Sequence, residues 1–572
     1  MSRTIGIDLG TTNSCVAVLD DKGTPRVLTV DGERTLPSVV SFAPGGAVEV
    51  GVAARRQAVT NAESTIFGAK RLIGRKVNTE DVTWFAGLAP FRIVAAPNGD
   101  AWLRIHGEPV SPQEVSAQIL RRLRSIAEAS LGETVTRAVI TVPAYFDDAQ
   151  RQATRDAGAI AGLDVLRILN EPTAAALAYG AHRGGGAQRV IAVFDLGGGT
   201  FDVSIMVVEN NLFEVVATDG DNALGGDDWD RCVLEHLVAE FQRQHRVDLR
   251  ANATAMARLR EACEEAKKAL STEKQTQLRL PFLGADDRGG PINLDRTISR
   301  AEVEQLTSAL VARLEAPCQR ALQAAGLSAA QIHDVLLVGG MTRWPAVEAV
   351  VERFFGRRPS KGANPDEVVA MGAAQYAGIL AGDSDEAALL DVTPRDIGIK
   401  VGDGRFSVLI PRNSMLPVRT RKQFATSSPD QKFVAIELYQ GESNDVAKNR
   451  KLGQVVLGDL PPGPAGSVRV DLVLTIDVES ILSVTARELR TGKEASVTIR
   501  PSGGLSQREI TEIIARRRQA SAQATGFELN LPAGAVTRVP TTELTADLSG
   551  DASSRGPFEG PEGPGRGGGA PR

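Results

Sequence analysis

Cysteine and histidine are scarce in this chain of 572 residues, which contains four cysteines and five histidines. Cys15, Cys232, Cys263 and Cys318 lie far apart in the sequence, and no two of them form a CxxC pair. This scatter predicts reduced thiols that lie mostly in the core, and it argues against disulfide bonds and zinc sites. The histidines are equally dispersed. We therefore expect no His-based triad and no His/Cys metal site, so the chemistry must depend on carboxylates, lysine, threonine and backbone amides.

The chain also lacks a strong excess of one charge and any long apolar run. Its formal net charge is −5, and no Lys/Arg block with interleaved aromatic residues occurs, so nucleic acid is not an expected partner. No apolar run approaches the length of a membrane span, and MSRTIGIDLG leads directly into a strand-like run. These features predict a cytoplasmic protein that does not contact a membrane. Its 42% hydrophobic content predicts a globular protein with about three domains.

Two stretches share one pattern, TIGIDLGTTNSCVAVL (Thr4–Leu19) and VIAVFDLGGGTFDVSI (Val190–Ile205). In each, an apolar strand ends at an aspartate, and a turn rich in glycine and threonine leads into a second strand. Glycine allows phosphate to approach the backbone N–H groups, and an aspartate beside phosphate requires a cation such as hydrated Mg²⁺ between them. Asp8 and Asp195 therefore predict water-mediated contacts with one Mg²⁺. One such turn alone is more typical of an ordinary hairpin, but two turns placed face to face would hold a polyphosphate from both sides.

The rest of the chain predicts further segments of different character. Strand-like and helical runs alternate up to residue 382, and VLLVGGMTRWP (Val335–Pro345) resembles another ligand turn of an α/β sheet. Period-two alternation in the C-terminal half predicts an antiparallel β domain, and Ser506 with Glu509 forms the capping box of a short helix. The composition of the C-terminus predicts a disordered Gly/Pro-rich tail. The predicted boundaries are an α/β domain at 1–382, a linker at 383–391, a β domain at 392–503, a short helix within 504–524 and a tail at 525–572.

Several longer motifs follow one another in a fixed order. They are GIDLGTTNSCVAV, KRLIGR (Lys70–Arg75), ITVPAYFDDAQRQATRDAG (Ile140–Gly158), ILNEPTAAALAYG (Ile168–Gly180), VFDLGGGTFDVS, LGGDDWD (Leu224–Asp230) and LLDVTP (Leu389–Pro394). Together they closely resemble the seventy-kilodalton heat-shock chaperones of the DnaK type, over residues 1 to about 505. The resemblance implies an actin-like, two-lobed α/β ATPase domain, a β-sandwich peptide-binding domain and a helical lid. It also implies a monomeric stress-response chaperone that binds exposed apolar segments of unfolded proteins and works with a J-domain co-chaperone and a nucleotide-exchange factor.

The resemblance further implies a role for individual residues in binding and hydrolysing ATP. Lys70 matches the lysine that contacts the γ-phosphate and orients the attacking water, and this suits phosphoryl transfer, which needs positive charge and a positioned water. Glu171 precedes Pro172 and is also typical of an N-cap, and a single lysine is most often a surface charge. The implied catalytic residues are Lys70, Glu171, Thr200 and Asp202; the Mg²⁺ residues are Asp8 and Asp195; the ATP/ADP contacts are Thr11, Thr12, Asn13, Gly197, Gly198, Gly225, Gly226, Glu264, Lys267, Lys268, Ser271, Gly339, Gly340, Arg343 and Asp366.

The resemblance also implies a set of peptide-binding residues and a set of allosteric residues. In both sets the sequence departs from the family pattern. Ala387 and Ala388 replace large apolar linker residues, which at about 1–2 kcal/mol each predicts weaker docking of the linker. Gly402 and Ser427 predict an open arch over the peptide, and the missing long lid predicts fast peptide exchange even with ADP bound. The implied peptide contacts are Ile399, Gly402, Phe424, Ser427, Val434 and Ile436; the implied allosteric residues are Pro143, Arg151, Arg167, Leu389, Leu390 and Asp391.

Three alternatives share part of this pattern. A small-metabolite kinase and an actin-like filament protein would have the same ATP cleft, but neither has a use for residues 392–503. A client-specific or regulatory adaptor of the same fold, with weak allostery and no effective lid, fits the altered linker better. Breadth of peptide binding would separate this adaptor from a general chaperone.

Overall fold

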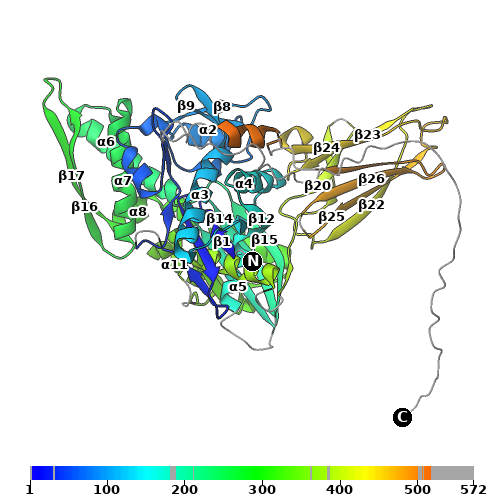
Figure 1. Ribbon diagram of the computed structural model, residues 1–572, viewed down its shortest axis with the longest axis horizontal. Helices are drawn as coiled ribbons and strands as arrows, with labels where there is room; N and C mark the ends of the chain where they lie inside the picture. The colour runs from blue at the N-terminus through cyan, green and yellow to red at the C-terminus, as the bar shows by residue number, and fades with distance from the viewer. Residues whose placement is uncertain are drawn as a thin grey trace, which may run out of the picture. The chain divides into compact units, whose positions relative to one another are not determined.

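The computed structural model describes residues 3–29, 32–180, 188–209, 211–360, 364–382, 387–402, 404–478, 480–499, 505–506 and 508–516. Residues Met1–Thr525 form one compact unit, and Figure 1 shows the order of its elements. The predicted tail at 525–572 lies outside the described residues, and the predicted domain boundaries stay predictions.

The first sheet forms the centre of lobe I, which we define as residues 3–180. Strands β1 (Thr4–Asp8) and β2 (Asn13–Leu19) form the first predicted hairpin, and β1 pairs in parallel with β11 (Arg137–Val142). The strand order is β12-β11-β1-β2-β3, with β4 on the other part of β2. The remaining strands of this sheet are β3 (Pro25–Val27), β4 (Leu36–Pro37) and β12 (Asp164–Asn170).

Lobe II, residues 188–360, repeats this plan. Strands β13 (Arg189–Leu196) and β14 (Phe201–Glu209) form the second predicted hairpin, and β13 pairs in parallel with β18 (Asp334–Val338). The strand order is β18-β13-β14-β15-β19. Strand β15 is Leu212–Asp221, and the edge strand β19 is Ala388–Leu390, which belongs to the predicted linker.

Smaller sheets and helices surround the two central sheets. Lobe I carries the sheets β6-β5-β7 and β10-β9-β8, and lobe II carries the hairpin β16-β17. The strands are β5 (Val40–Phe42), β6 (Val48–Val50), β7 (Thr65–Ile66), β8 (Arg92–Ala95), β9 (Ala101–Ile105), β10 (Glu108–Val110), β16 (Gln275–Ala285) and β17 (Pro291–Ser299). The helices are α1 (Val52–Gln57), α2 (Glu80–Ala86), α3 (Pro112–Leu131), α4 (Asp148–Ile160), α5 (Glu171–Gly180), α6 (Gly226–His245), α7 (Ala253–Leu270), α8 (Arg300–Leu306), α9 (Ser308–Ala312), α10 (Glu315–Ala325), α11 (Pro345–Phe355) and α12 (Val368–Ala381).

Helices α5 and α12 pack closely against each other and against strand β1 of the lobe I sheet. A Cβ added to Gly372 of α12 would lie 1.7 Å from the carbonyl oxygen of Ala174 in α5. A Cβ added to Gly6 of β1 would lie 2.1 Å from the nitrogen of Ala374 in α12. Only glycine permits these approaches, so α12, which follows lobe II in the chain, packs directly against the first strand of lobe I.

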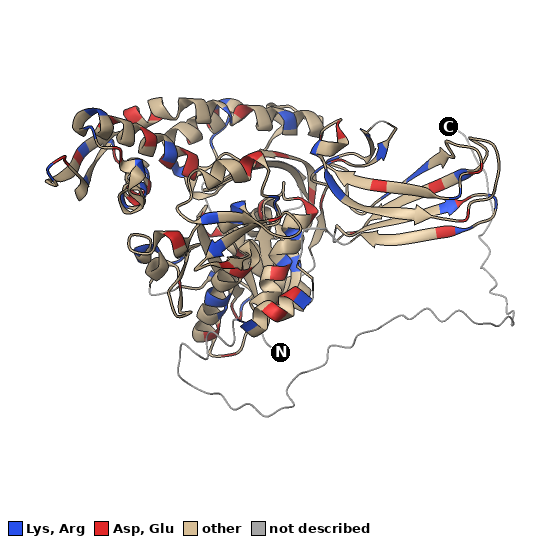
Figure 2. Cartoon of the chain, turned by 90° about the horizontal axis from the view of Figure 1, so that it is seen from above, with Lys and Arg blue, Asp and Glu red and all other residues tan. Residues whose placement is uncertain are grey.

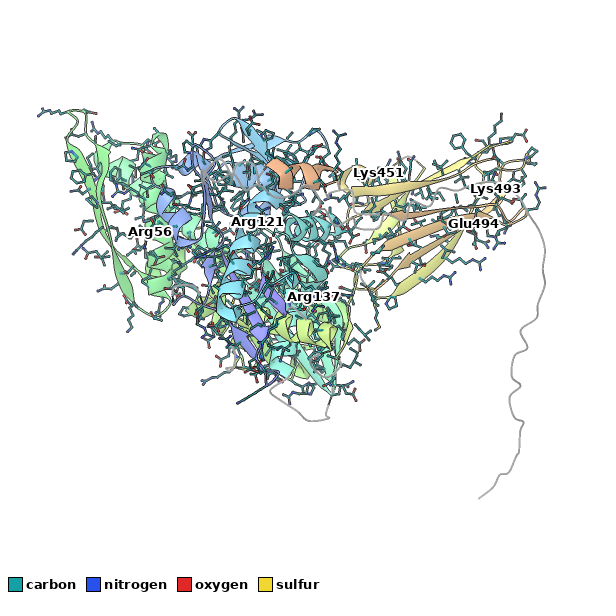
Figure 3. The ribbon with its side chains drawn as sticks, in the orientation of Figure 1. Arg56, Arg121, Arg137, Lys451, Lys493 and Glu494 are labelled. Carbon is teal, nitrogen blue, oxygen red and sulfur yellow. The ribbon has the colours of Figure 1, made fainter. Side chains whose placement is uncertain are left out.

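The C-terminal half contains two antiparallel sheets that enclose an apolar core. Val470, Leu472, Leu474 and Ile476 are buried on one face of β25, as their alternation predicts. Lys451 lies on β24 and Glu494 on β27, one on each sheet (Figure 3). The sheets are β21-β20-β23-β24 and β22-β25-β26-β27, with strands β20 (Ile397–Val401), β21 (Arg405–Ile410), β22 (Val418–Ala425), β23 (Val434–Gln440), β24 (Arg450–Leu457), β25 (Arg469–Ile476), β26 (Leu482–Glu488) and β27 (Glu494–Ile499).

A short helix at 508–516 follows the β-sandwich and packs on lobe I. Its predicted capping box is present, because the Glu509 N–H donates to Ser506 Oγ and the Ser506 N–H donates to Glu509 Oε2. Ile510 and Ile513 are buried in the apolar core of lobe I. The helix is drawn in orange in Figure 1. The mixed α/β architecture with a β-sandwich therefore confirms the predicted fold class.

Charge and cysteine distribution also follow the sequence analysis. Figure 2 shows Lys and Arg interspersed with Asp and Glu. All four cysteines are free thiols, and Cys15, Cys263 and Cys318 are buried. In the described part of the chain, no helix has the length and apolar character needed to span a bilayer.

Candidate nucleotide site

The tips of the two predicted hairpins face each other across the gap between the lobes. A Cβ added to Gly198 would lie 1.9 Å from Thr12 Oγ1, and one added to Gly199 would lie 2.9 Å from Thr11 Cγ2. The approach therefore depends on glycine in the second tip. This is the face-to-face arrangement that the duplicated pattern predicts for holding a polyphosphate.

Buried carboxylates gather at the ends of both hairpins. Asp195 and Asp202 are directly paired across β13 and β14 and are 7% and 2% exposed. Burial, together with the charge of Glu171, raises the pKa of Asp8 to about 7 and that of Asp202 to about 7. Burial and Glu171 also raise the pKa of Asp195 well above its ordinary value. The cluster thus carries more negative charge than its surroundings stabilise.

Lys70 contributes one positive charge to this cluster. Its Nζ lies 2.6 Å from Glu171 Oε1, and both side chains are buried. Lys70 lies in a 3₁₀ turn (Ala69–Arg71), and Glu171 begins α5. One lysine does not balance this many carboxylates, so the donor set fits a divalent cation.

The described residues contain no group of three or more His, Cys, Asp or Glu side chains that could hold a metal directly. An Mg²⁺ here would therefore need water and phosphate oxygens to complete its coordination, as Mg²⁺ usually does in nucleotide sites. Asp8 is further fixed by Thr141, whose hydroxyl donates to Asp8 Oδ1 over 3.2 Å. The residues present therefore fit a hydrated Mg²⁺ that accompanies a bound phosphate chain.

A cavity of about 740 Å³ connects the hairpin tips with the end of α7 and the turn after β18. Gly339 has φ +81°, and a Cβ there would lie 2.4 Å from the Leu196 carbonyl oxygen, so the turn lies against the end of β13. Arg343 donates to Asp366 over 2.8 Å and closes the opposite wall. The predicted residues that line this cavity are Asp8, Thr11, Thr12, Asn13, Lys70, Glu171, Asp195, Gly197, Gly198, Thr200, Gly226, Glu264, Lys267, Lys268, Ser271, Gly339, Gly340, Arg343 and Asp366.

Gly225 and Asp202 are the two predicted residues of this group that do not line the cavity. A Cβ on Gly225 would lie 2.5 Å from the Gly198 backbone, so this glycine allows α6 to begin against the second tip. Asp202 instead accepts a hydrogen bond from the Tyr145 N–H over 3.3 Å. Both residues support the tips from behind.

Sequence reasoning missed two arginines that join the parts of the site. Arg71 Nε donates to Asp227 over 3.1 Å, and its Nη2 donates to the Gly198 carbonyl over 3.2 Å, so a lobe I residue holds the second tip. Arg34 Nε donates to Glu367 Oε1 over 2.7 Å, just before α12. The position of Arg71 directly after Lys70 in the motif KRLIGR could have indicated that it lies near the site. Arg34 had no local signal, because its partner lies in a distant part of the chain.

Two comparisons with known proteins identify the family. A family model described as "Hsp70 protein" matches residues 4–530. The chain belongs to the Hsp70 family. It is also 49% identical over 510 residues to a protein named "Heat shock 70 kDa protein, mitochondrial" from Pisum sativum, covering 89% of this chain and 75% of that relative. Hsp70 proteins are ATPases that bind nucleotide with Mg²⁺ and generally work with J-domain proteins and nucleotide-exchange factors, so membership supports a chaperone role.

One prediction from the sequence is wrong by this comparison. The cytoplasmic location rested on composition and on the strand-like run at the start of the sequence, whereas the Pisum sativum relative carries a mitochondrial name. Composition reports solubility and charge but not the compartment, so the cytoplasmic assignment is withdrawn. The Hsp70 match also covers the β-sandwich, which neither the kinase nor the filament alternative uses, and it gives no support to the adaptor alternative.

The residues predicted to contact peptide lie in the β-sandwich. Ile399 and Ile436 are buried in its core, and Phe424 and Val434 pack against that core while remaining partly exposed. Gly402 has φ +52°, and no atom of the described residues lies within 4 Å of its Cβ position. Ser427 is exposed, and its N–H donates to Gln431 over 2.9 Å. Gly402 and Ser427 therefore offer little side-chain surface with which to cover a peptide.

The predicted allosteric residues lie where the Hsp70 linker and β-sandwich meet the lobes. Leu389 and Leu390 are part of β19, where Leu389 pairs with Phe213 and Leu390 with Glu214. Asp391 accepts a hydrogen bond from Asn170, which in turn accepts one from Arg151 over 2.6 Å.

Two of these residues lie on the side of lobe I. Arg167 donates to the carbonyl of Val478 in the β-sandwich. Pro143 accepts from the Phe146 N–H over 3.2 Å, in the loop that carries Tyr145. Tyr145 joins Asp202 behind the nucleotide site to Glu442 of the β-sandwich, to which its hydroxyl donates over 2.6 Å. The sequence analysis did not single out Tyr145, although it lies within the motif ITVPAYFDD.

Proposed function

We propose that this Hsp70 is an ATP-driven chaperone in which nucleotide in the cleft between the lobes regulates how tightly the β-sandwich holds apolar segments of unfolded proteins. The observation that carries this proposal is that the linker strand and a strand at the cleft belong to the same sheet of lobe II. Asp195 lies near the end of strand β13 and lines the cleft, and the same sheet ends at β19, the strand formed by the linker. A change at the cleft can therefore reach the linker through one continuous sheet.

The chemistry proposed for the cleft is phosphoryl transfer from ATP to water. Thr11, Thr12, Gly197 and Gly198 would bind the phosphates through their backbone N–H groups, which the close approach of the tips brings together. Hydrated Mg²⁺ beside Asp8 and Asp195 would supply positive charge to the phosphates. Such positive charge, fixed in advance, stabilises the charge that develops in the transition state.

Lys70 and Glu171 would act together at the γ-phosphate. The 2.6 Å contact between them fixes the Lys70 ammonium within the cleft, so that its charge faces the phosphate and the attacking water. Glu171 is then in place to accept or relay the proton that the water loses. Thr200 lines the same cavity and would bind the phosphate or the water through its hydroxyl.

The peptide site proposed here is the β-sandwich surface around Phe424 and Val434, with extended apolar polypeptides as the ligand. A J-domain co-chaperone and a nucleotide-exchange factor are the proposed partners, and Arg167 and Asp391 are proposed contacts of the former. The chain is proposed to act as a monomer. The open arch at Gly402 and Ser427 favours rapid exchange of peptide even with ADP bound.

The release of a fluorescent apolar heptapeptide tests this function. We expect ATP to accelerate release from the ADP-bound protein by about tenfold or more, which corresponds to about 1.4 kcal/mol of coupling. Equal release rates with ADP and with bound ATP would contradict the proposal. A release half-time of minutes with ADP would contradict the expectation of an open arch while leaving the ATPase chemistry untouched.

A further inference from the structure

Ser38 lies directly behind the tip of the first hairpin, just after the short strand β4 that pairs with β2. It is buried, and it is outside the set of described residues that line the nucleotide cavity, whereas the tip residues Gly10, Thr11, Thr12 and Asn13 line it. The Ser38 Oγ donates to the Gly10 carbonyl over 2.8 Å, and the Ser38 N–H donates to the Thr12 carbonyl over 2.8 Å. One residue therefore holds two carbonyl groups of the tip.

These two hydrogen bonds fix the direction in which N–H groups of the tip point. In a planar trans peptide, the C=O of one residue and the N–H of the next point in opposite directions. Because the carbonyls of Gly10 and Thr12 point to Ser38, the N–H groups of Thr11 and Asn13 point away from it, on the side of the cavity. Backbone N–H groups that point to one side form an anion-binding concavity. Ser38 thus prepares the tip for phosphate without reaching the cavity itself.

A second serine extends this contact away from the cleft. Ser14 Oγ lies 2.9 Å from Ser38 Oγ, and both serines are buried. A hydroxyl carries one proton, and Ser38 donates its own to the Gly10 carbonyl, so Ser14 is the donor in this pair. The hydrogen bonds therefore run from Ser14 to Ser38 and from Ser38 to the tip, and each bond of such a chain strengthens the next.

The second tip is held from behind in a different way. The Gly197 carbonyl accepts from the Gly226 N–H over 3.0 Å, and the Gly198 carbonyl accepts from the Asp227 N–H over 2.8 Å, both at the start of α6. Backbone N–H groups of a helix thus hold the second tip, where a serine side chain helps to hold the first. A substitution of this serine therefore loosens the first tip and leaves the α6 contacts of the second tip in place.

We propose that Ser38 is a positioning residue that, with Ser14 behind it, holds the first tip in the conformation that binds the phosphates of ATP. This inference rests on the proposed function, because it concerns the phosphate chain that the tips would bind. The contacts of Ser38 lie at the tip, and the cavity wall at the end of α7 and the turn after β18 is formed by other residues. Ser38 therefore contributes to binding of the phosphates and not of the nucleoside.

Calorimetric titration of the full chain with Mg·ATP, Mg·ADP and adenosine tests this role, because adenosine has no phosphate. We expect Ser38→Ala to weaken binding of ATP and ADP by about fivefold or more, as the loss of a hydrogen bond to a partly buried carbonyl predicts. We expect the affinity for adenosine to stay within about twofold, since no contact to the nucleoside changes. Ser14→Ala keeps the bond from Ser38 to Gly10 and is expected to weaken ATP binding by only about twofold.

Ser41→Ala is the matched control for the loss of a buried hydroxyl. Ser41 is a buried residue of the nearby strand β5, and its Oγ lies 3.0 Å from Thr65 Oγ1. Both of these described residues lie outside the set that lines the nucleotide cavity. We expect Ser41→Ala to lower the unfolding temperature as Ser38→Ala does, and to leave the affinities for ATP, ADP and adenosine unchanged.

The outcomes separate the role of Ser38 from the proposed function. Unchanged ATP affinity in Ser38→Ala, or equal losses for ATP and adenosine, would overturn the role of Ser38 and leave the proposed function in place. An unaltered chain that binds ATP no more tightly than adenosine would overturn the proposed function as well, since the tips would then not bind phosphate. If Ser38→Ala does not fold, Ser14→Ala decides: an unchanged ratio of ATP to adenosine affinity overturns the proposal.

Discussion

The two lobes share one plan but receive different parts of the C-terminal half. Each has a hairpin whose tip faces the cleft and a parallel strand beside it, β11 in lobe I and β18 in lobe II. Lobe II extends its sheet with the linker strand β19, whereas lobe I buries Ile510 and Ile513 of the helix at 508–516. The two lobes therefore contribute equivalent hairpin tips to the cleft, but they contact different segments of the C-terminal half.

Under the proposed function, this difference indicates how a ligand in the cleft would act on the peptide domain. A nucleotide held by both tips would fix the position of one lobe relative to the other, and with it the two surfaces on which the linker and the short helix pack. An ion pair of 2.9 Å between Arg412 of the β-sandwich and Asp219 also joins the C-terminal half to lobe II. We infer that losing either tip, or either docked segment, uncouples the two halves of the molecule.

Replacing Lys70 by alanine has the largest expected effect. This substitution tests the proposed ATP hydrolysis at the phosphates that both tips would hold. We expect single-turnover ATP hydrolysis to slow by about 10²–10³-fold, since a positive charge fixed beside the phosphate is lost, while ATP affinity changes far less. Lys22→Ala, at an exposed position, is the matched control. Hydrolysis at the unaltered rate would remove Lys70 from the chemistry.

Gly198→Ala tests the approach of the tips. Its Cβ would overlap Thr12 Oγ1, so the tips must separate, and we expect ATP affinity measured by calorimetry to fall about tenfold to hundredfold. Gly458→Ala has open space around its Cβ and is expected to bind ATP as the unaltered chain does. Wild-type affinity in Gly198→Ala would show that the tips need not approach each other.

Leu389→Ala tests the attachment of the linker strand β19. Leu389 packs partly buried against an apolar cluster that contains residues of both lobes, and removing it costs about 1 kcal/mol of docking. We expect the acceleration of peptide release by ATP to fall roughly fivefold. Leu489→Ala, on the β-sandwich surface, should leave this acceleration intact. If both variants behave alike, the linker strand does not carry the signal.

Asp156→Asn tests the attachment to lobe I and has the smallest expected effect. Asp156 accepts from the Leu505 N–H over 2.7 Å, and burial raises its pKa above the ordinary value. The Asp156 carboxyl thus binds a proton more tightly in the folded chain than in the unfolded chain. The contribution of Asp156 to folding stability therefore falls as pH rises above the unfolded pKa near 4. Asparagine keeps an acceptor and removes the charge.

Thermal unfolding across pH measures this effect. We expect Asp156→Asn to raise the unfolding temperature by about 1–2 °C at pH 7.5 and by less near pH 4. The exposed substitution Asp459→Asn controls for a general effect of charge, and its side chain is 90% exposed. A loss of stability at pH 7.5 would mean that the charge of Asp156 is favourable where it lies.

The local features of this molecule follow from its sequence more readily than the distant ones. The hairpins, the alternation in β25 and the capping box at Ser506 each depend on neighbouring residues, and the structure confirms them. Helix α12 begins at Val368 after a turn at residues 365–367, where the distant Arg34 binds Glu367, and no local pattern indicates that contact. The pairing of Lys70 with Glu171 joins distant parts of the chain, so only the family resemblance pointed to it.

The linker prediction concerned side chains, whereas the structure shows pairing through the backbone. Ala387 and Ala388 predicted weak docking because two large side chains are missing, yet Ala388 begins β19 and its N–H donates to the Asn211 carbonyl over 2.9 Å. Backbone pairing does not depend on side-chain size, and the apolar contact comes from Leu389. The effect of the alanines on docking strength stays a prediction.

Hydrogen exchange at residues 387–391, with ATP and with ADP, tests the central claim most directly, because it reports whether the linker pairs with β15. We predict slow exchange of these amides with ATP and exchange at least about tenfold faster with ADP, as loss of about 1.4 kcal/mol of protection requires. Equal exchange in both nucleotide states would contradict the claim that the cleft controls the linker through the sheet of lobe II.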